Sequence, residues 1–379
     1  MTPATRIARV DVILVRLPLR RVVHLPRGAS RTLDEGKRLA LVRVESAGGL
    51  VGWGETSPSR RWSAETLEGA MASLRGYLAP SVIGQDAEDL VGLHTSMDRE
   101  LAPGLDQGQP IAKAALDFAC HDLVARARGV PVQALLGPAE PGEIRLAYLV
   151  SAATPDEATA QVEEGRAEGY DAFKVKVGGR PPAADVAIAR AVVDAAAGAV
   201  VWVDANQGYD ETAALAAARG FAALGLTVFE QPVGAADWPA LRALKRATPM
   251  TIALDEGAVS APLIEELLRQ GLCDAVVLKV AKLGGLHHAR RVAGLCRARG
   301  VMLLGSGLMD APITLAAGLH AFAAAGVTFP ADLNGPQFIA RDYLAEPLPI
   351  KAGRLAVPDR PGLGWEPDPA RVEALRIQE

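Results

Sequence analysis

Residues 200–230 read VVWVDANQGYDETAALAAARGFAALGLTVFE, two short apolar runs joined by an Ala-rich stretch. The first run ends at Asp204 and the second at Glu230, so each has a carboxylate at its C-terminal end. Short apolar runs of this kind are typical of parallel strands that are buried on both faces. Asp210 can cap a helix between the two runs, and Gly225 can end it. The stretch therefore predicts one β/α unit.

The same unit recurs along most of the chain. We count eight predicted strands, at residues 144–150, 172–177, 200–204, 226–230, 251–255, 275–279, 301–305 and 327–332. Strictly alternating strands and helices form a parallel sheet, and eight strands close into a barrel. The predicted fold class is α/β, a (β/α)₈ TIM-type barrel. An open doubly wound sheet is the alternative, but no Gly-x-Gly-x-x-Gly follows the first strand.

The segments that flank the predicted barrel have different patterns. Longer alternating strands at 7–17, 38–45 and 50–54 precede helical patterns near 64–78, 87–101 and 111–128. We therefore divide the chain into an α+β domain (1–128), the barrel (129–335) and a C-terminal segment (336–379). The C-terminal segment has a strand-like run at 354–357 and is expected to return to the N-terminal domain. Residues 20–37, which join the first two strands, are long enough for a mobile lid.

Composition and charge exclude several classes of protein. The chain has 379 residues, and 40 Lys and Arg against 44 Asp and Glu give a formal charge of −4, without the basic patch of a nucleic-acid binder. No segment approaches the roughly twenty apolar residues of a membrane span, and no signal peptide precedes the first strand. Cys120, Cys273 and Cys296 lie in scattered apolar contexts, typical of buried free thiols. We expect a cytoplasmic protein with no nucleic-acid or membrane partner.

Charged residues stand at the ends of five consecutive predicted strands. Because these ends lie at one mouth of a barrel, the side chains are expected to form an arc around a site. Three converging carboxylates raise one another's pKa unless a cation lies between them. An all-oxygen ligand set favours Mg²⁺, with Mn²⁺ as the other candidate. The charged residues are Lys174, Lys176, Asp204, Glu230, Asp255 and Lys279.

The lysines suggest acid/base chemistry. Lys174 and Lys176 lie two residues apart on a strand, so they point to the same side. A second ammonium and a nearby divalent cation are both expected to lower the pKa of the amine. Lys279 lies four strands further round the ring. The two sets of amines then face each other, which suits proton transfer at the carbon α to a carboxylate. Lys282 follows the predicted strand at 275–279, and we interpret it as a surface lysine.

Several short motifs occur together along almost the whole chain. They are Lys174-Val175-Lys176, Asp204-Ala205-Asn206, Glu230-Gln231-Pro232, Asp255-Glu256, LKVAKLGG at 278–285, GWGE at 52–55 and ALDFA at 115–119. As a set they resemble the enolase superfamily, and within it the muconate-lactonising-enzyme subgroup of the mandelate racemase/muconate lactonizing enzyme family.

The resemblance implies a capping domain over a modified barrel, with Mg²⁺ held by Asp204, Glu230 and Asp255. It implies that Lys176 and Lys279 are the acid/base pair, with Lys174 beside them. Residues 20–37 and the segment after GWGE are expected to close over the substrate. A homo-oligomer with an even number of subunits, such as an octamer, is also expected.

Some positions depart from related subgroups. No His occurs in 305–310, so the His–Asp dyad of mandelate racemases is missing, and Asp310 stands where many relatives carry Glu. Asp332-Leu333-Asn334 replaces the Asp-x-Asp of dipeptide epimerases, although Asp310 or Asp332 can still pair with a substrate amine. The candidate substrate contacts are Asn206, His24, Arg27, Asp310, Asp332 and Asn334. Arg31, Arg60 and Arg61 either attract an anionic substrate or are ordinary solvated charges.

The leading hypothesis is a Mg²⁺-dependent enzyme that removes the proton α to the carboxylate of a small substrate, as an epimerase or racemase of an amino-acid derivative. A muconate-type cycloisomerase and an acid-sugar or hydroxy-amino-acid dehydratase are alternatives that use the same residues. A Schiff-base aldolase with a catalytic lysine is a more distant alternative.

Overall fold

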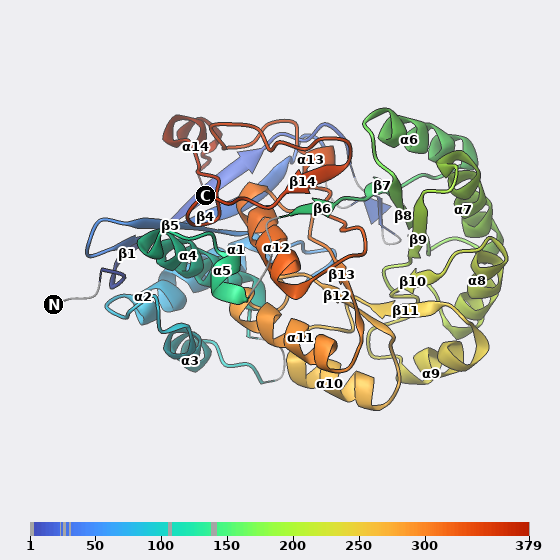
Figure 1. The fold of residues 1–379 in the computed structure, drawn as a ribbon, viewed down its shortest axis with the longest axis horizontal. Coiled ribbons are helices and arrows are strands. Elements are labelled where there is room, and N and C mark those ends of the chain that lie inside the picture. Colours follow the sequence, from blue (N-terminus) through green and yellow to red (C-terminus); the bar gives the residue numbers. More distant parts are fainter. Residues whose placement is uncertain are drawn as a thin grey trace.

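The structure is a computed structural model that describes residues 4–22, 24–25, 28–29, 32–104, 108–137 and 142–378. Its N-terminal part is a three-stranded antiparallel sheet in the order β1-β4-β5, covered by helices (Figure 1). Strand β1 matches the predicted 7–17, and β4 is one residue longer at each end than predicted. The elements are β1 (Ile7–Leu17), β4 (Lys37–Ser46), β5 (Val51–Thr56), α1 (Leu67–Ser73), η1 (Leu74–Leu78), α2 (Ala79–Val82), α3 (Leu90–Glu100) and α4 (Pro110–Arg128).

The barrel is a curved, parallel seven-stranded sheet in the order β13-β12-β11-β10-β9-β8-β7. Helices alternate with its strands and surround it, as Figure 1 shows for α6 to α9. The strands are β7 (Tyr148–Val150), β8 (Ala172–Lys176), β9 (Val200–Asp204), β10 (Val228–Glu230), β11 (Thr251–Leu254), β12 (Ala275–Leu278) and β13 (Met302–Gly305). The helices are α6 (Pro155–Ala167), α7 (Pro182–Ala196), α8 (Glu211–Ala223), α9 (Trp238–Ala247), α10 (Ala261–Arg269), α11 (Leu286–Ala298) and α12 (Pro312–Ala325). A modified TIM barrel with a capping domain is therefore confirmed.

Two predicted strands differ in the structure. Residues 327–332 do not form an eighth strand; only the single bridges Leu146↔Ala331 and Ser306↔Asp332 join this segment to its neighbours. These two bridges complete the ring between β13 and β7. The predicted strand 144–150 divides into β6 (Glu143–Arg145) and β7, and β6 pairs with β14 (Arg354–Ala356) outside the barrel. Both segments are mostly apolar, so their composition does not distinguish barrel pairing from these other contacts.

The C-terminal segment lies against both other parts of the chain. It contains α13 (Gly335–Phe338), β14 and α14 (Pro369–Leu375), and the short α5 (Gln133–Leu136) precedes the barrel. The backbone N–H of Ile377 donates to Leu14 O of β1 at 3.1 Å, while β14 pairs with β6. The boundaries 1–128, 129–335 and 336–379 stay predictions. Within the predicted lid, β2 (His24–Leu25) pairs with β3 (Gly28–Ala29), and its mobility also stays a prediction.

Asp117 of α4 joins the capping domain to barrel helix α11. The N-cap of α11 is Gly285, which has no side chain, and Asp117 supplies the missing acceptor. Its Oδ1 accepts from Leu286 N at 2.5 Å, and its Oδ2 lies 2.8 Å from His94 Nε2. Burial alone would raise the pKa of Asp117, but His121 and His94 hold it below its usual range. This contact gives a physical reason for Asp117 in the ALDFA motif.

Glu55 of β5 makes a similar contact with barrel helix α12. Its Oε1 accepts from the backbone N–H of Ala311, the N-cap of α12, at 3.2 Å, and its Oε2 accepts from the Tyr343 hydroxyl. Burial raises the pKa of Glu55 to about 7. Glu55 is the acidic residue of the GWGE motif, so two motif carboxylates of the capping domain each bind the start of a barrel helix.

The core is built mainly from small and branched apolar side chains, and only 4% of the residues in the chain are aromatic. Cys120, Cys273 and Cys296 are buried free cysteines, which confirms that prediction. His320 is fully buried, and His287 and His288 pack against His94, so all three histidines have packing roles. Across the described ranges, every helix is too short or too polar to cross a membrane.

We predict that Gly54→Ala destabilises the protein by at least about 2 kcal/mol. A Cβ at this position would lie 1.8 Å from Ala115 O, so β5 and α4 would have to move apart. Urea denaturation followed by circular dichroism measures the free energy of unfolding. Gly76→Ala is the control, because a Cβ there meets nothing within 4 Å and Ala favours the helix. Equal stability of the two variants would contradict the packing argument.

Candidate active site

The strand ends of β9 and β10 turn sharply at the mouth of the barrel. Asn206 and Gln231 have positive φ values of 41° and 34°, which non-glycine residues seldom adopt. Such conformations are concentrated at functional sites. The sheet register places Lys176 beside Asp204 and Asp204 beside Glu230, so the charged strand ends lie level with one another. This register is consistent with the predicted arc of charged side chains around one mouth of the barrel.

Lys174 lies at the centre of a buried group of charges. Its Nζ lies 2.9 Å from Asp204 Oδ2, 2.8 Å from Glu230 Oε1 and 2.9 Å from Asp332 Oδ2. All four side chains are almost completely buried. Burial disfavours the ammonium, but the carboxylates outweigh this effect and raise the pKa of Lys174 well above its usual value. Lys174 is therefore a counter-charge to these carboxylates, and the expectation that its pKa is lowered is wrong.

Lys176 lies next to Lys174 and belongs to a chain of hydrogen bonds. Its Nζ donates to Asp204 Oδ2 and to Asn206 Oδ1, each at 2.7 Å. Asn206 Nδ2 in turn donates to Glu256 Oε1 at 3.1 Å. Lys174 and Lys176 both reach the same oxygen of Asp204, so the prediction that they point to the same side is confirmed.

Lys279 and Lys282 both bind Asp255 at the end of β11. Lys279 Nζ lies 2.5 Å from Asp255 Oδ2, and Lys282 Nζ lies 2.8 Å from Asp255 Oδ1. The interpretation of Lys282 as a surface lysine is wrong: its side chain is buried, because the turn after β12 brings it back over Asp255. Lys279 Nζ also lies 4.4 Å from the ring centroid of Trp62, in a cation–π contact.

The three carboxylates predicted to bind a metal have different proton affinities. Burial and the neighbouring Asp204 raise the pKa of Glu230 to about 7. Burial also opposes ionisation of Asp255, but Lys279 and Lys282 lower its pKa to about 2. Lys174 and Lys176 outweigh burial in the same way and lower the pKa of Asp204. The electrostatic balance of each carboxylate therefore depends on the ammonium groups beside it.

The donor set fits a hard divalent cation in its chemistry. Asp204, Glu230 and Asp255 are buried, supply only oxygen atoms and stand at the ends of three adjacent parallel strands. Ammonium groups contact each of them in the structure. Among the described residues, no three His, Cys, Asp or Glu side chains form a cluster that could hold a metal ion. The role of Asp204, Glu230 and Asp255 as metal ligands stays a prediction.

The structure places the predicted substrate contacts in different surroundings. Asp332 binds Lys174, Ser306 and Asn334, so its carboxylate is already engaged. Asp310 accepts from Leu308 N and lines a separate pocket of about 290 Å³. The side chain of His24 and the whole of Arg27 lie outside the described residues, as does Arg31. Arg60 and Arg61 are exposed, and their contact with a substrate, like that of the other candidates, stays a prediction.

Two side chains near the lysines were not expected from the sequence. Trp62 covers Lys279, and Glu256 binds Asn206. The adjacent pair Asp255-Glu256 was a signal for Glu256. The negative charges of two consecutive acidic residues at a barrel mouth need nearby positive charges or hydrogen-bond donors to stabilise them. Trp62 gave no such signal, since its contact with Lys279 depends on how the capping domain lies over the barrel.

Two family models match most of this chain. Residues 157–371 match the family model "Enolase C-terminal domain-like", and residues 10–137 match "Mandelate racemase / muconate lactonizing enzyme, N-terminal domain". A chloromuconate cycloisomerase of Pseudomonas putida is 33% identical over 97% of this chain and 98% of its own. An L-Lys-D/L-Arg epimerase of Methylococcus capsulatus is 35% identical over 95% of this chain and 98% of its own.

Solved structures give the same assignment. A muconate lactonizing enzyme from Pseudomonas fluorescens, complexed with muconolactone, has a TM-score of 0.91 at 27% identity and covers 99% of this chain and 100% of its own. A dipeptide epimerase from Enterococcus faecalis, complexed with Mg and L-Leu-L-Tyr, has a TM-score of 0.88 at 26% identity, over 95% of this chain and 99% of its own. The chain therefore belongs to the muconate lactonizing enzyme subgroup of the mandelate racemase/muconate lactonizing enzyme family, in the enolase superfamily.

Proposed function

We propose that this isomerase transfers the proton α to the carboxylate of an amino-acid derivative, as a Mg²⁺-dependent epimerase or racemase. The observation that carries this proposal is the placement of two lysines on either side of three carboxylate-bearing strand ends. Lys176 binds Asp204 at one end of this series, and Lys279 binds Asp255 at the other. The similarity to an L-Lys-D/L-Arg epimerase supports the same class of reaction.

The two lysines would act on opposite faces of the substrate. A neutral amine on one side removes the α proton, and an ammonium on the other side returns a proton, which inverts the configuration. Asn206 holds Lys176 by a hydrogen bond of 2.7 Å and so limits the directions in which its amine can point. Trp62 covers Lys279 and reduces its contact with water.

A divalent cation held by Asp204, Glu230 and Asp255 would supply positive charge where negative charge develops on the substrate carboxylate. The ammonium groups that now contact these carboxylates mark the positions where positive charge is needed. Mg²⁺ is our choice over Mn²⁺ because the donors are all carboxylates and because a related epimerase is complexed with Mg.

A cycloisomerase that acts on a muconate is the second candidate. The 33% identity to a chloromuconate cycloisomerase over almost the whole chain favours it. In that reaction one lysine moves a proton and the other contributes only charge. Cytoplasmic location and an even-numbered homo-oligomer stay predictions for either function.

We predict that the wild-type enzyme exchanges the α proton of both enantiomers of a suitable amino-acid derivative in D₂O, with inversion. Lys176→Ala and Lys279→Ala should each lower kcat by at least about 100-fold, because each removes one acid/base group. Proton NMR measures the exchange, and polarimetry measures the inversion. Lys351→Ala, at an exposed lysine, is the control and should keep full activity. Full activity of Lys176→Ala would refute the two-lysine mechanism, and lactone formation from muconate without exchange would favour the cycloisomerase.

We predict that removal of divalent cations by EDTA abolishes activity and that Mg²⁺ restores it. Asp255→Asn should weaken Mg²⁺ binding at least about tenfold, because one of three anionic ligands is lost. Isothermal titration calorimetry with MgCl₂ measures this directly, without turnover. Asp359→Asn makes the same chemical change at an exposed position and should bind Mg²⁺ as the wild type does. Undiminished binding by Asp255→Asn would remove this residue from the ligand set.

We predict that Lys174→Met lowers the free energy of unfolding in EDTA by about 3–5 kcal/mol. The substitution leaves Asp204, Glu230 and Asp332 buried without the ammonium that contacts all three. Urea denaturation in EDTA measures the loss, and Lys351→Met serves as a control for the loss of an exposed lysine. A change below about 1 kcal/mol would show that Lys174 is not the main counter-charge.

A further inference from the structure

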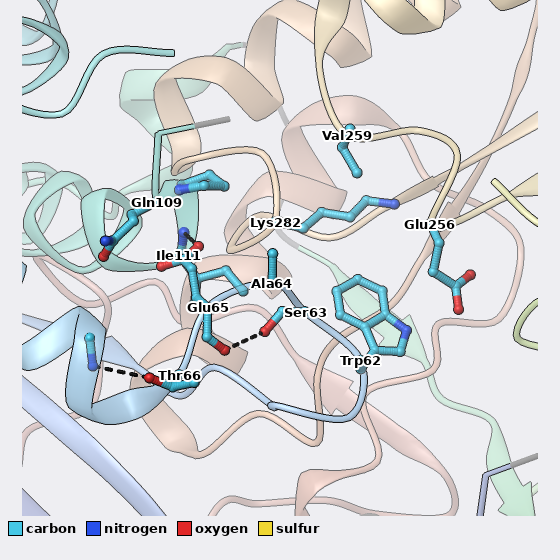
Figure 2. A pocket seen from close by; sticks show the side chains of 12 residues that line it. Trp62, Ser63, Ala64, Glu65, Thr66, Gln109, Ile111, Glu256, Val259 and Lys282 are labelled. Atoms are coloured by element: carbon cyan, nitrogen blue, oxygen red, sulfur yellow. Dashed lines mark hydrogen bonds between the residues drawn. The ribbon is translucent and has the colours of Figure 1, made fainter. Parts of the chain in front are cut away.

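A pocket of about 390 Å³ lies between the capping domain and the barrel, and its lining residues Trp62 and Lys282 contact Lys279 and Asp255, respectively. Trp62 and Glu65 line it from the segment after β5, Gln109 from the start of α4, and Glu256 and Lys282 from the loops after β11 and β12. Figure 2 shows Trp62, Lys282 and Glu256 toward one end of this pocket and Gln109 toward the other. We call it the Trp62 pocket. Its volume lies within the usual range for a small-molecule site.

The Trp62 pocket contains an unusual number of unsatisfied polar atoms. Across the described residues, seven buried side-chain nitrogen or oxygen atoms have no hydrogen-bond partner. Three of the seven belong to residues that line this pocket: Trp62 Nε1, Gln109 Oε1 and Glu256 Oε2. A buried polar atom without a partner costs about 1–3 kcal/mol, so such atoms are rare unless a ligand satisfies them.

The other charged groups of the pocket are already engaged. Glu65 accepts from Ile111 N at 2.7 Å and from Ala112 N at 3.0 Å, so its carboxylate caps α4. Lys282 donates to both the carbonyl and the carboxylate of Asp255. Glu256 uses one oxygen for Asn206 and keeps the other unpartnered. The unsatisfied atoms are therefore two acceptors, one of them on a carboxylate, and one donor.

The position of Glu256 is fixed by its neighbours rather than by a ligand. Gln231 Oε1 accepts from Asp255 N and from Gly257 N, each at 3.0 Å, so the backbone on both sides of Glu256 is held. The carboxylate is thus oriented before anything binds. A preorganised acceptor loses little conformational entropy on binding, which strengthens the interaction.

We propose that the Trp62 pocket binds the cationic end of the substrate side chain, an ammonium or a guanidinium, which donates to Glu256 and Gln109. This proposal rests on the proposed function and names its substrate class: derivatives of basic amino acids. Trp62 in the wall of the pocket contacts Lys279, so the substrate side chain would extend into the pocket while the α carbon lies between the lysines. The indole N–H of Trp62 then donates to an oxygen of the same substrate, such as the acyl carbonyl.

The test compares two isosteric ligands, L-alanyl-L-arginine and L-alanyl-L-citrulline, which differ in the charge of the side-chain terminus. Isothermal titration calorimetry with the Mg²⁺-loaded enzyme should show the arginine dipeptide binding at least about tenfold more tightly, the effect of a hydrogen bond to a charged group. Glu256→Gln should reduce this ratio to near one. It keeps the oxygen that accepts from Asn206, and circular dichroism checks its fold. Glu211→Gln, at an exposed site on α8, should keep the wild-type ratio.

The same dipeptides separate this proposal from the proposed function. A ratio near one in the wild type, or an unchanged ratio in Glu256→Gln, overturns the cation site even if α-proton exchange occurs. Selective binding of the arginine dipeptide that is lost in Glu256→Gln supports the cation site. If this selectivity is seen without α-proton exchange, only the proposed reaction is refuted.

Trp62→Phe keeps an aromatic ring over Lys279 and removes the indole N–H. It should weaken both dipeptides equally, whereas a loss confined to the arginine dipeptide would overturn the role given to the indole N–H.

Discussion

The balance between buried carboxylates and lysine ammonium groups at the barrel mouth is the constraint on which the site depends. Lys174 contacts three carboxylates, and Asp255 is contacted by two lysines. Unpaired charges in these positions would each cost several kcal/mol, so no member can be removed without affecting the others. The barrel tolerates this cost only because the strand ends hold the groups at hydrogen-bonding distance.

The capping domain is attached to the barrel through the same kind of interaction. Asp117 and Glu55 each place a carboxylate at the start of a barrel helix, where the first N–H groups lack partners within the helix. Both contacts are buried hydrogen bonds. Because a hydrogen bond depends on direction as well as on distance, each contact orients the two elements that it joins. The two motif residues that have no part in the proton-transfer proposal thus have a structural role. They fix the orientation of the domain that carries Trp62.

The sequence predicted the fold and most of the charged strand ends because both follow from local patterns. Strand β9 agrees with the predicted 200–204, and Lys174, Lys176 and Asp204 meet as the spacing of β/α units implies. Residues 327–332 and Lys282 were misjudged because their environments depend on tertiary contacts. Residues 327–332 are partly apolar but form single bridges only, and Lys282 follows a strand end whose turn reverses the direction of the chain. Trp62 could not be predicted because its partner belongs to another domain.

The loop that carries Trp62 shows how one scaffold can serve several substrates. Glu55 stands just before this loop and binds the start of α12, while Glu65 stands near its end and binds the start of α4. Both ends are therefore fixed by buried carboxylates, and the loop between them carries the exposed residues Arg60 and Arg61. Changes in the loop would alter the wall of the Trp62 pocket, whereas Lys176 and Lys279 are held by Asp204 and Asp255 of the barrel. Under the proposals made above, substrate choice and proton transfer would be controlled by different parts of the chain, which meet where Trp62 lies over Lys279.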